Sequence, residues 1–321
     1  MYREGGLDFH AGTEEDVRVV TAALPSEVKD GLRYDAVPWV RFHHAYGPGG
    51  DVPARLEAIR LGDADAAERA LGTLWNSICH QGGTSAVGAL AVPFLLRIAL
   101  AHPRHRADLL WLVGSVARRQ HFGEASRTGL LRAGLPHDSM RWEPSGYPQN
   151  WSLEAARQAV TTDADLVLHL LDDPAPAVRQ AAAFALAAAA PPPRHGPAAL
   201  HARLTVEDDP AVRACLVLAI GQLAREEGEP DTAARLHEWW QDPTRPTDVR
   251  VSAALAWLCL VDDPIPDDLD TLLDTAVTDD LTALLAPVPW LRDAEDGGKD
   301  NGLLTALAQM RNPDDYRWLD Y

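Results

Sequence analysis

Positively charged residues are scarce in this chain. Of its 321 residues, 29 are Lys or Arg and 47 are Asp or Glu, so the formal net charge at pH 7 is −18. Proteins that bind nucleic acids need a cationic surface that displaces counterions from the phosphates, and this composition disfavours such a surface. We therefore expect the partner to be something other than nucleic acid.

Cysteine and long apolar runs are also scarce. Cys79, Cys215 and Cys259 are an odd number without metal-site spacing, and we expect them to be reduced thiols. The longest wholly apolar run, residues 181–190, is too short to span a bilayer. The first residues contain no apolar stretch typical of a signal peptide. The sequence thus predicts a cytoplasmic protein that does not enter a membrane.

The motifs of common enzyme families are missing as well. The sequence has no phosphate-binding loop, no dinucleotide fingerprint and no nucleophile elbow. His102 and His105 have no cysteine pair or carboxylate at metal-ligand spacing. The acidic stretch 293–304 has Leu304 where a calcium loop ends in glutamate. We therefore expect no metal ion and no cofactor.

Three similar stretches are present at nearly constant intervals. Each ends in a Val-Arg pair, at residues 178–179, 212–213 and 249–250. The valines are 34 and 37 residues apart, a period typical of stacked helical pairs. After each valine, apolar residues recur in steps of four, three and four, which is one face of an α-helix. We predict that the second helix of each pair begins near these valines. We place the first helices at about 163–172, 197–205 and 230–241.

This pattern resembles HEAT-like repeats, including those of largely uncharacterised bacterial HEAT-repeat proteins. The resemblance rests on the acid- and proline-containing turn before Val-Arg, and on an acid six residues before the arginine. Asp173 precedes Arg179 in this way, and Glu207 precedes Arg213. The resemblance implies an all-α fold, a right-handed α-α superhelix or solenoid. It also implies a ladder of acid–arginine pairs between neighbouring repeats.

The arginine column of the repeats could bind phosphates or could pair internally, and the acids at fixed spacing favour internal pairing. We expect Arg213→Ala to leave Glu207 without a partner. Thr244 stands where the third repeat should have its acid, so Arg250→Ala should be less damaging.

The repeats suggest a division of the whole chain into five parts. We expect an N-terminal segment of unclear structure, helical pairs, an irregular loop or lid, HEAT-like repeats and acidic capping helices, at residues 1–52, 53–120, 121–150, 151–266 and 267–321. Helices are expected at 13–24, 63–79, 85–101 and 106–120. The second helices of the repeats have small apolar residues off their core stripe. Either the chain's own loop or termini cover this face, or it is an apolar groove for a partner helix or a small hydrophobic ligand.

The end of the 63–79 helix gathers residues capable of binding or chemistry, namely Trp75, Asn76, His80 and Gln81. Asn76 and His80 are four residues apart, so they share one helix face. An amide and an imidazole could orient a substrate or take part in acid–base chemistry. They could equally cap a polar helix end.

Aromatic residues lie in or beside the irregular loop, at Trp142, Tyr147 and Trp151. Aromatic rings with one polar edge are good interface anchors, although they also fill cores. We predict that 121–150 is a movable cover over a pocket formed with the 75–81 turn. Trp142 or Tyr147 should then approach His80.

These observations leave three functions open. The first is a scaffold or adaptor without catalytic activity that binds a protein or peptide. The second is a tailoring or hydrolytic enzyme with a small-molecule pocket under the loop, whose site would include Asn76, His80, His121 and His137. The third is an immunity-type partner of a basic protein, because residues 261–321 contain fifteen acidic and four basic residues. HEAT-like DNA glycosylases fit poorly, because their concave face is basic.

We expect the protein not to bind duplex DNA tightly, because useful affinity requires several phosphate contacts by cations. Anisotropy titration of a labelled duplex at moderate salt is the measurement. Sub-micromolar binding that weakens steeply as salt is added would contradict this expectation.

Overall fold

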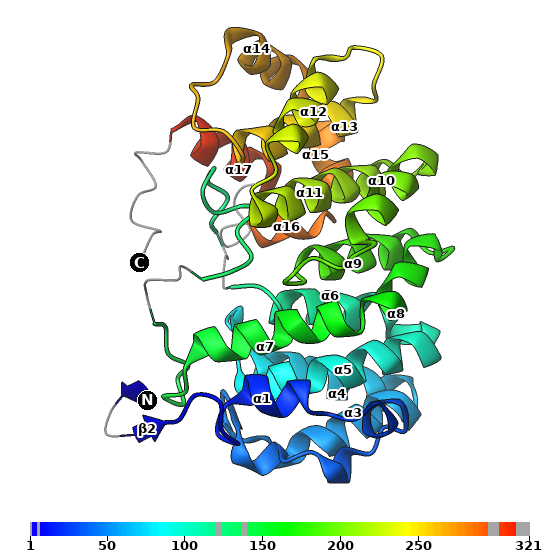
Figure 1. Cartoon of the computed structure of the whole chain (residues 1–321). Helices are drawn as coiled ribbons and strands as arrows, with labels where there is room; N and C mark the ends of the chain where they lie inside the picture. Colours follow the sequence, from blue (N-terminus) through cyan, green and yellow to red (C-terminus); the bar gives the residue numbers. More distant parts are fainter. Residues whose placement is uncertain (1, 5–6, 120–122, 136–139, 295–301, 313–321) are drawn as a thin grey trace. The chain divides into compact units, whose positions relative to one another are not determined.

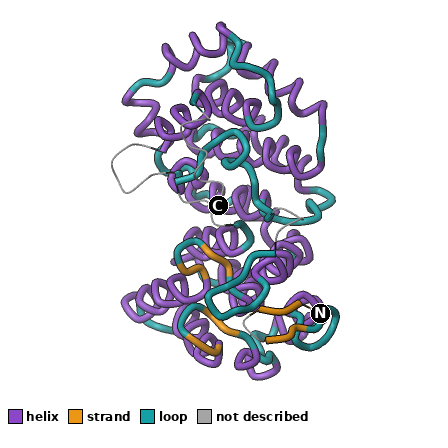
Figure 2. Tube along the Cα trace, turned by 90° about the vertical axis from the view of Figure 1, so that its left-hand side faces the viewer, coloured by secondary structure: helices purple, strands orange, loops and turns teal. Residues whose placement is uncertain are grey.

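The structure, a computed structural model, describes residues 2–4, 7–119, 123–135, 140–294 and 302–312. The chain folds into two compact units. The N-terminal unit consists of residues 1–120, 133–169 and 188–193, and the C-terminal unit of residues 121–132, 170–187 and 194–321. Both units are built mainly of helices joined by loops (Figures 1 and 2).

The N-terminal unit combines helices with three short antiparallel hairpins. Its α-helices are α1 (Val17–Ala22), α2 (Ser26–Asp30), α3 (Val52–Leu61), α4 (Ala64–Ile78), α5 (Ala86–Ala101), α6 (Arg106–Val116), α7 (Gln149–Thr162) and α8 (Ala164–Leu168). Short 3-10 helices are η1 (Tyr34–Ala36), η2 (Trp39–Arg41), η3 (Gly49–Asp51) and η4 (Pro103–His105). The hairpins pair β1 (Tyr2–Glu4) with β2 (Leu7–Phe9), β3 (His43–His44) with β4 (Gly47–Pro48), and β5 (Cys79–His80) with β6 (Gly83–Thr84).

The core of this unit forms around α5, which is apolar on nearly all sides and buried along most of its length. A helix without a polar face must be covered all round. Helices α6 and α7 pack on α5, and α1 packs on both α5 and α7. The N-terminal segment, whose structure was unclear from the sequence, thus supplies part of this cover. No single helix of the described residues has the length and apolar character to cross a membrane.

The C-terminal unit contains the repeats except for α8, the first helix of the first pair, which belongs to the N-terminal unit. Its helices are α9 (Pro176–Ala187), α10 (Gly196–Val206), α11 (Pro210–Glu227), α12 (Pro230–Gln241), α13 (Thr247–Leu258), α14 (Asp267–Ala276), α15 (Asp279–Leu285), α16 (Pro289–Asp293) and α17 (Gly302–Arg311), with η5 (His169–Asp172) before them. Helix α11 packs on α9 and α13, α10 on α11, and α12 on α13.

The positions of the repeat helices were largely readable from the sequence. Helices α9, α11 and α13 begin within two residues of the three valines, and the first helices correspond to α8 with η5, α10 and α12. Helix α11 shows the local reason. Pro210 stands at its first position, where no N–H is needed, and the Asp209 carboxylate accepts from the Val212 amide at 3.0 Å. The prediction of an all-α repeat fold is confirmed.

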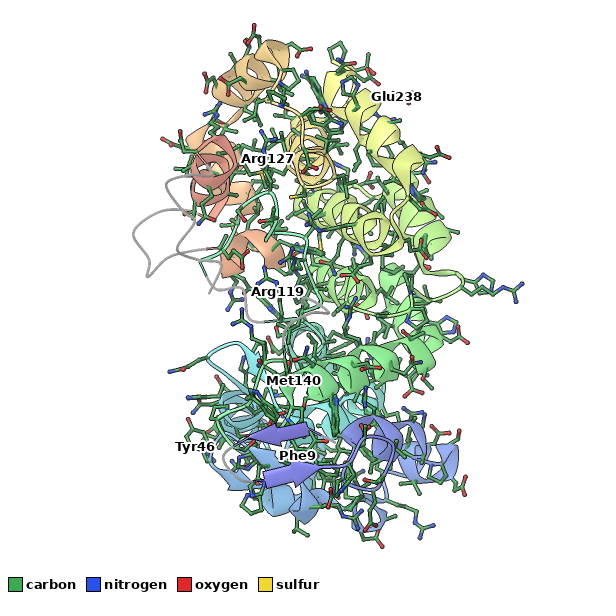
Figure 3. All side chains as sticks on the ribbon, turned by 60° about the vertical axis from the view of Figure 1, so that its left-hand side comes forward. Phe9, Tyr46, Arg119, Arg127, Met140 and Glu238 are labelled. Atoms are coloured by element: carbon green, nitrogen blue, oxygen red, sulfur yellow. The ribbon has the colours of Figure 1, made fainter. Side chains whose placement is uncertain are left out.

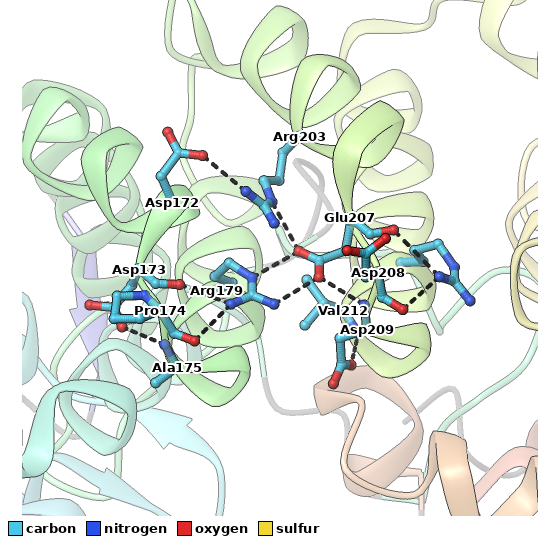
Figure 4. A network of polar contacts seen from close by, with 11 residues as sticks. Asp172, Asp173, Pro174, Ala175, Arg179, Arg203, Glu207, Asp208, Asp209 and Val212 are labelled. Atoms are coloured by element: carbon cyan, nitrogen blue, oxygen red, sulfur yellow. Dashed lines mark hydrogen bonds and ion pairs between the residues drawn. The ribbon is translucent and has the colours of Figure 1, made fainter.

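A ladder of ion pairs links successive repeats (Figure 4). Arg179 donates to both carboxylate oxygens of Glu207, at 2.7 and 2.8 Å, and Arg203 donates to Glu207 at 2.9 Å. Burial raises the pKa of Glu207, but hydrogen bonds from Arg179, the Asp209 amide and Arg203 outweigh this effect and hold it at about 2. Each bidentate contact ties the arginine of one repeat to the acid of the next.

The pairing expected for Arg213 was wrong. Its guanidinium donates to Asp248 at 2.8 and 3.0 Å, whereas Glu207 is held by Arg179 and Arg203. The third repeat therefore has an acid, but four residues after Thr244, in the first turn of α13. Arg250 donates to the carbonyl oxygen of Trp240 at 3.1 Å.

The small apolar face of the second helices is covered by the chain itself. Its residues on α9, α11 and α13 are buried, for example Ala183, Val217 and Ala254. The side chain of Leu131 approaches Gly221 so closely that a Cβ there would lie 3.2 Å from it. Trp290 packs on Phe184, with ring centroids 5.0 Å apart. The expected alternative, an open groove for a helix or a hydrophobic ligand, is thus wrong for this face.

We expect Arg213→Ala to lower the free energy of unfolding by roughly 2–4 kcal/mol, because it leaves the buried Asp248 carboxylate without its cation. Arg250→Ala removes a hydrogen bond to a carbonyl group and should cost about 1 kcal/mol. Urea unfolding of both variants measures the difference. Equal shifts of the midpoints would contradict the ladder.

Adding Asp248→Ala to Arg213→Ala should recover part of the loss, because no buried charge then remains unpaired.

Candidate functional site

A tight hairpin connects α4 to α5 and positions His80. Strands β5 and β6 are joined by Gln81 and Gly82, whose φ angles are 50° and 76°. A two-residue turn with both angles positive matches the twist of antiparallel strands. Gln81 has a side chain and is therefore strained in this conformation, which only a well-fixed hairpin tolerates. The Thr84 hydroxyl helps to hold the hairpin in place by donating to the carbonyl oxygen of Val116 at 2.5 Å.

Asn76 and His80 are brought together, but not on one helix face as expected, because α4 ends at Ile78 and His80 lies in β5; a third residue joins them. The Asn76 amide donates to the Tyr46 hydroxyl at 2.8 Å. His80 Nδ1 lies 3.2 Å from the same hydroxyl and 3.3 Å from Asn76 Oδ1. We call these three residues the Tyr46 cluster. Sequence reasoning missed Tyr46 because it comes from a hairpin 30 residues earlier, and no periodic signal connects the two segments.

The backbone of Tyr46 is fixed by a chain of polar contacts. Its amide donates to His44 Nδ1 at 3.1 Å, and His44 Nε2 lies 2.9 Å from Asp51. Arg55 donates to Asp51 at 2.6 Å. Burial raises the pKa of Asp51, but the hydrogen bonds from Arg55 and His44 bring it below its ordinary value. The Tyr46 ring lies at the surface of the N-terminal unit, 62% exposed (Figure 3).

A small pocket lies beside His80. It is lined by both hairpins and by the loop before α7, including Ser77, Glu143, Ser145 and Gln149. Its volume is about 30 Å³. This is the space of roughly one water molecule. The pocket therefore has no room for a substrate.

Glu143 is the most perturbed acid of this region and is only 5% exposed. Burial raises the pKa of Glu143 to about 8, although hydrogen bonds from Ser152, Ser145 and the Ala86 amide act in the opposite direction. At neutral pH the carboxyl group is therefore mainly protonated. Its role is to join the loop to the first turns of α5 and α7.

The loop aromatics contact the N-terminal segment. The Tyr147 hydroxyl donates to the Glu15 carbonyl at 2.7 Å and accepts from the Val17 amide at 2.9 Å. The Tyr147 ring lies 5.2 Å from that of Phe9 and 5.9 Å from that of Trp151. These contacts fix the start of α1.

The remaining predicted site residues are dispersed. Trp142 lies 6.5 Å from Phe9, Trp75 packs on Trp111 at 6.4 Å, and Gln81 is exposed at the hairpin tip. The structure thus unites Asn76 and His80 but not the aromatics with them. His121 and His137 lie outside the described residues.

Comparison with known protein families bears on the C-terminal helices. Residues 164–259 match the family model for HEAT repeats. These residues form a HEAT-like repeat array. The matched range runs from α8 to the end of α13, so the array has the three helix pairs that the valine spacing predicted. No curated protein and no solved structure matches the chain significantly.

The segment between α6 and α7 divides between the two units. Residues 123–132 belong to the unit of the HEAT-like array, where Gln309 of α17 accepts from the Ala125 amide at 2.7 Å and donates to the Gly123 carbonyl at 2.6 Å. Residues 140–149 belong to the N-terminal unit and supply the wall beside His80. The single cover expected from the sequence is therefore two segments with different contacts.

Glu143 predicts a specific pH dependence of stability. Because its pKa is raised on folding, its stabilising contribution is complete below the ordinary value of 4.5 and is lost as pH rises toward about 8. The free energy of unfolding of the wild type should fall relative to that of Glu143→Gln by about 3–4 kcal/mol over this range. Urea unfolding at several pH values measures both proteins. A constant difference between them would contradict the assignment.

Proposed function

We propose that this protein is a binding scaffold whose partner is another protein or a peptide, recognised through the Tyr46 cluster. The HEAT-like array supports the general part, because helical repeats commonly serve as scaffolds for protein interactions. The observation that supports the Tyr46 cluster as the binding surface is the combination of exposure and hydrogen bonding at Tyr46. Its ring is largely exposed, yet its hydroxyl is held by both Asn76 and His80.

An exposed tyrosine with a fixed hydroxyl is well suited to be an interface anchor. A partner that buries such a ring gains apolar contact without having to order a mobile side chain. His80 and His44 also lie edge-to-face against the ring, with centroids 5.3 and 6.3 Å away. The cluster is therefore preorganised for binding.

The geometry supports binding at this surface more than catalysis or binding in the array. The pocket beside His80, about 30 Å³, is too small for the substrate of a tailoring or hydrolytic enzyme. The small-residue face of α9, α11 and α13, where a solenoid could hold a peptide, is already covered. Tyr46 is the more accessible contact.

The acidic C-terminal helices have a structural explanation. Asp267, Asp268 and Asp270 stand in the first turn of α14, where carboxylates interact favourably with the helix dipole. Arg311 pairs with Asp270 at 2.7 Å and with Asp274 at 2.6 Å. These contacts give a structural role to four of the fifteen acids of residues 261–321. The experiment below therefore also tests the immunity-type function.

Site-specific photo-crosslinking tests the proposal. A photo-reactive phenylalanine analogue at position 46 should capture one partner when the full chain is expressed at native level in its own host. Two exposed positions serve as controls, Leu61 in the same unit and Thr271 on α14. Capture from Thr271 instead of Tyr46, weakened by added salt, would replace the proposal with the immunity-type function.

Binding of the captured partner should then depend on the ring of Tyr46. We expect Tyr46→Ala to weaken the affinity about 30-fold, as for an interface anchor, and Tyr46→Phe only about threefold. Leu61→Ala, a change at a similarly exposed residue, should leave the affinity unchanged. Calorimetry with the purified partner measures all three. Equal affinities of Tyr46→Ala and the wild type would contradict the proposal.

A further inference from the structure

A cavity of the N-terminal unit lies apart from the Tyr46 cluster. It is lined by residues of α1, α2 and α7 and by Pro93 of α5, and its volume is about 540 Å³. Sites for small organic molecules have volumes of this order. Its lining shares no residue with the small pocket at His80.

The charged residues in the cavity wall are all paired, and Arg97, which is not a lining residue, supplies a third cation by donating to Asp163 at 2.9 and 3.1 Å. The lining cations are Arg18 and Lys29, and the carboxylates are Asp16, Glu154 and Asp163. Arg18 pairs with Asp16 at 2.7 Å and with Glu154 at 2.8 Å. Lys29 pairs with Asp163 at 3.2 Å. Because no cation is in excess, the wall does not favour an anionic ligand, and because each carboxylate has a cation, it does not favour a cationic ligand either.

Two buried polar groups in the wall retain hydrogen-bonding capacity. The Thr21 hydroxyl makes no hydrogen bond within the described structure, and Thr21 is only 7% exposed. The Lys29 ammonium group has three N–H bonds, and both of its hydrogen bonds, at 3.2 and 3.5 Å, go to Asp163. Lys29 is also only 7% exposed. A buried hydroxyl without a partner is unfavourable, so an acceptor that entered the cavity would be stabilised there.

The rest of the wall is largely apolar. Val19, Ala22, Pro93, Ala155 and Ala159 provide this surface. Small side chains from α1 and α7 leave the space open, and the start of α1 is held in place by Tyr147, as described above. The cavity therefore combines an apolar enclosure with a few polar groups, as in most small-molecule sites.

We propose that this cavity binds a small uncharged molecule with an apolar body and a carbonyl or hydroxyl oxygen. The oxygen accepts hydrogen bonds from Thr21 Oγ1 and Lys29 Nζ, and the body lies against the alanines of α7. This site is independent of the Tyr46 cluster and of the scaffold function proposed above.

Four related probes of similar size test the ligand class on the purified full chain. Benzamide carries a carbonyl oxygen, benzoate is an anion, benzylamine is a cation, and toluene lacks a polar group. We expect millimolar binding of benzamide, seen by saturation-transfer NMR and by shifts of the Val19 methyl signals, and weaker binding of the other three. The proposal fails if benzamide does not bind at several millimolar. That result would mean that the cavity holds only water. It also fails if any of the other three binds as tightly as benzamide.

Variants locate the binding. Thr21→Val keeps the shape of the side chain but removes the hydroxyl, and should weaken benzamide binding about fivefold. Thr73→Val is the matched control, because Thr73 is exposed on α4 of the same unit. Ala159→Leu should fill part of the cavity and abolish binding, and circular dichroism of each variant reports folding. Unchanged affinity in folded Thr21→Val or folded Ala159→Leu would overturn the proposal. If both unfold, saturation of benzamide binding without Val19 methyl shifts would overturn it as well.

Discussion

The small side chains along α9, α11 and α13 impose the main constraint on the C-terminal unit. Alanine and glycine bury little apolar area each, so a helix rich in them is stabilised chiefly by close neighbours on every side. At Gly221 the neighbour Ala256 is so close that an added Cβ would lie 2.8 Å from it. In the described structure Leu131, α15 and α16 cover the small-residue face of these helices. The same covering removes the groove that a solenoid could offer to a peptide.

The charged residues of the repeats also interact mainly with one another. The chain has few cations, and the arginines of the repeat turns, Arg179, Arg213 and Arg250, are engaged by its own acids and carbonyl groups. Arg179 and Arg213 each hold the carboxylate of the following repeat, which fixes the stacking of neighbouring helices. The surface charge of the protein is accordingly dominated by carboxylates, many of them at helix N-termini.

The N-terminal unit offers two candidate binding features. Tyr46 is exposed and orientated by hydrogen bonds, and a cavity of about 540 Å³ lies between α1 and α7. Both depend on the first 52 residues, which pack against helices far along the chain. Tyr147, from the loop before α7, is one such contact, because its hydroxyl bonds to the backbone of this N-terminal segment at the start of α1. A segment without periodic sequence signals thus shapes both candidate binding sites.

The sequence by itself determined the helical pairs, because a Val-Arg turn and a stripe of apolar residues act locally. It also pointed to Asn76 and His80 as neighbours, but the reason it offered, a shared helix face, was wrong, because α4 ends at Ile78 and His80 lies in β5. Only the tertiary structure decided that Arg213 bonds Asp248, that Tyr46 joins His80, and that Lys29 and Asp163 line one cavity. These contacts join segments whose relative placement depends on packing of the whole unit. No local pattern encodes them, because a side chain 30 or more residues away leaves no trace in the spacing of its partner's neighbours.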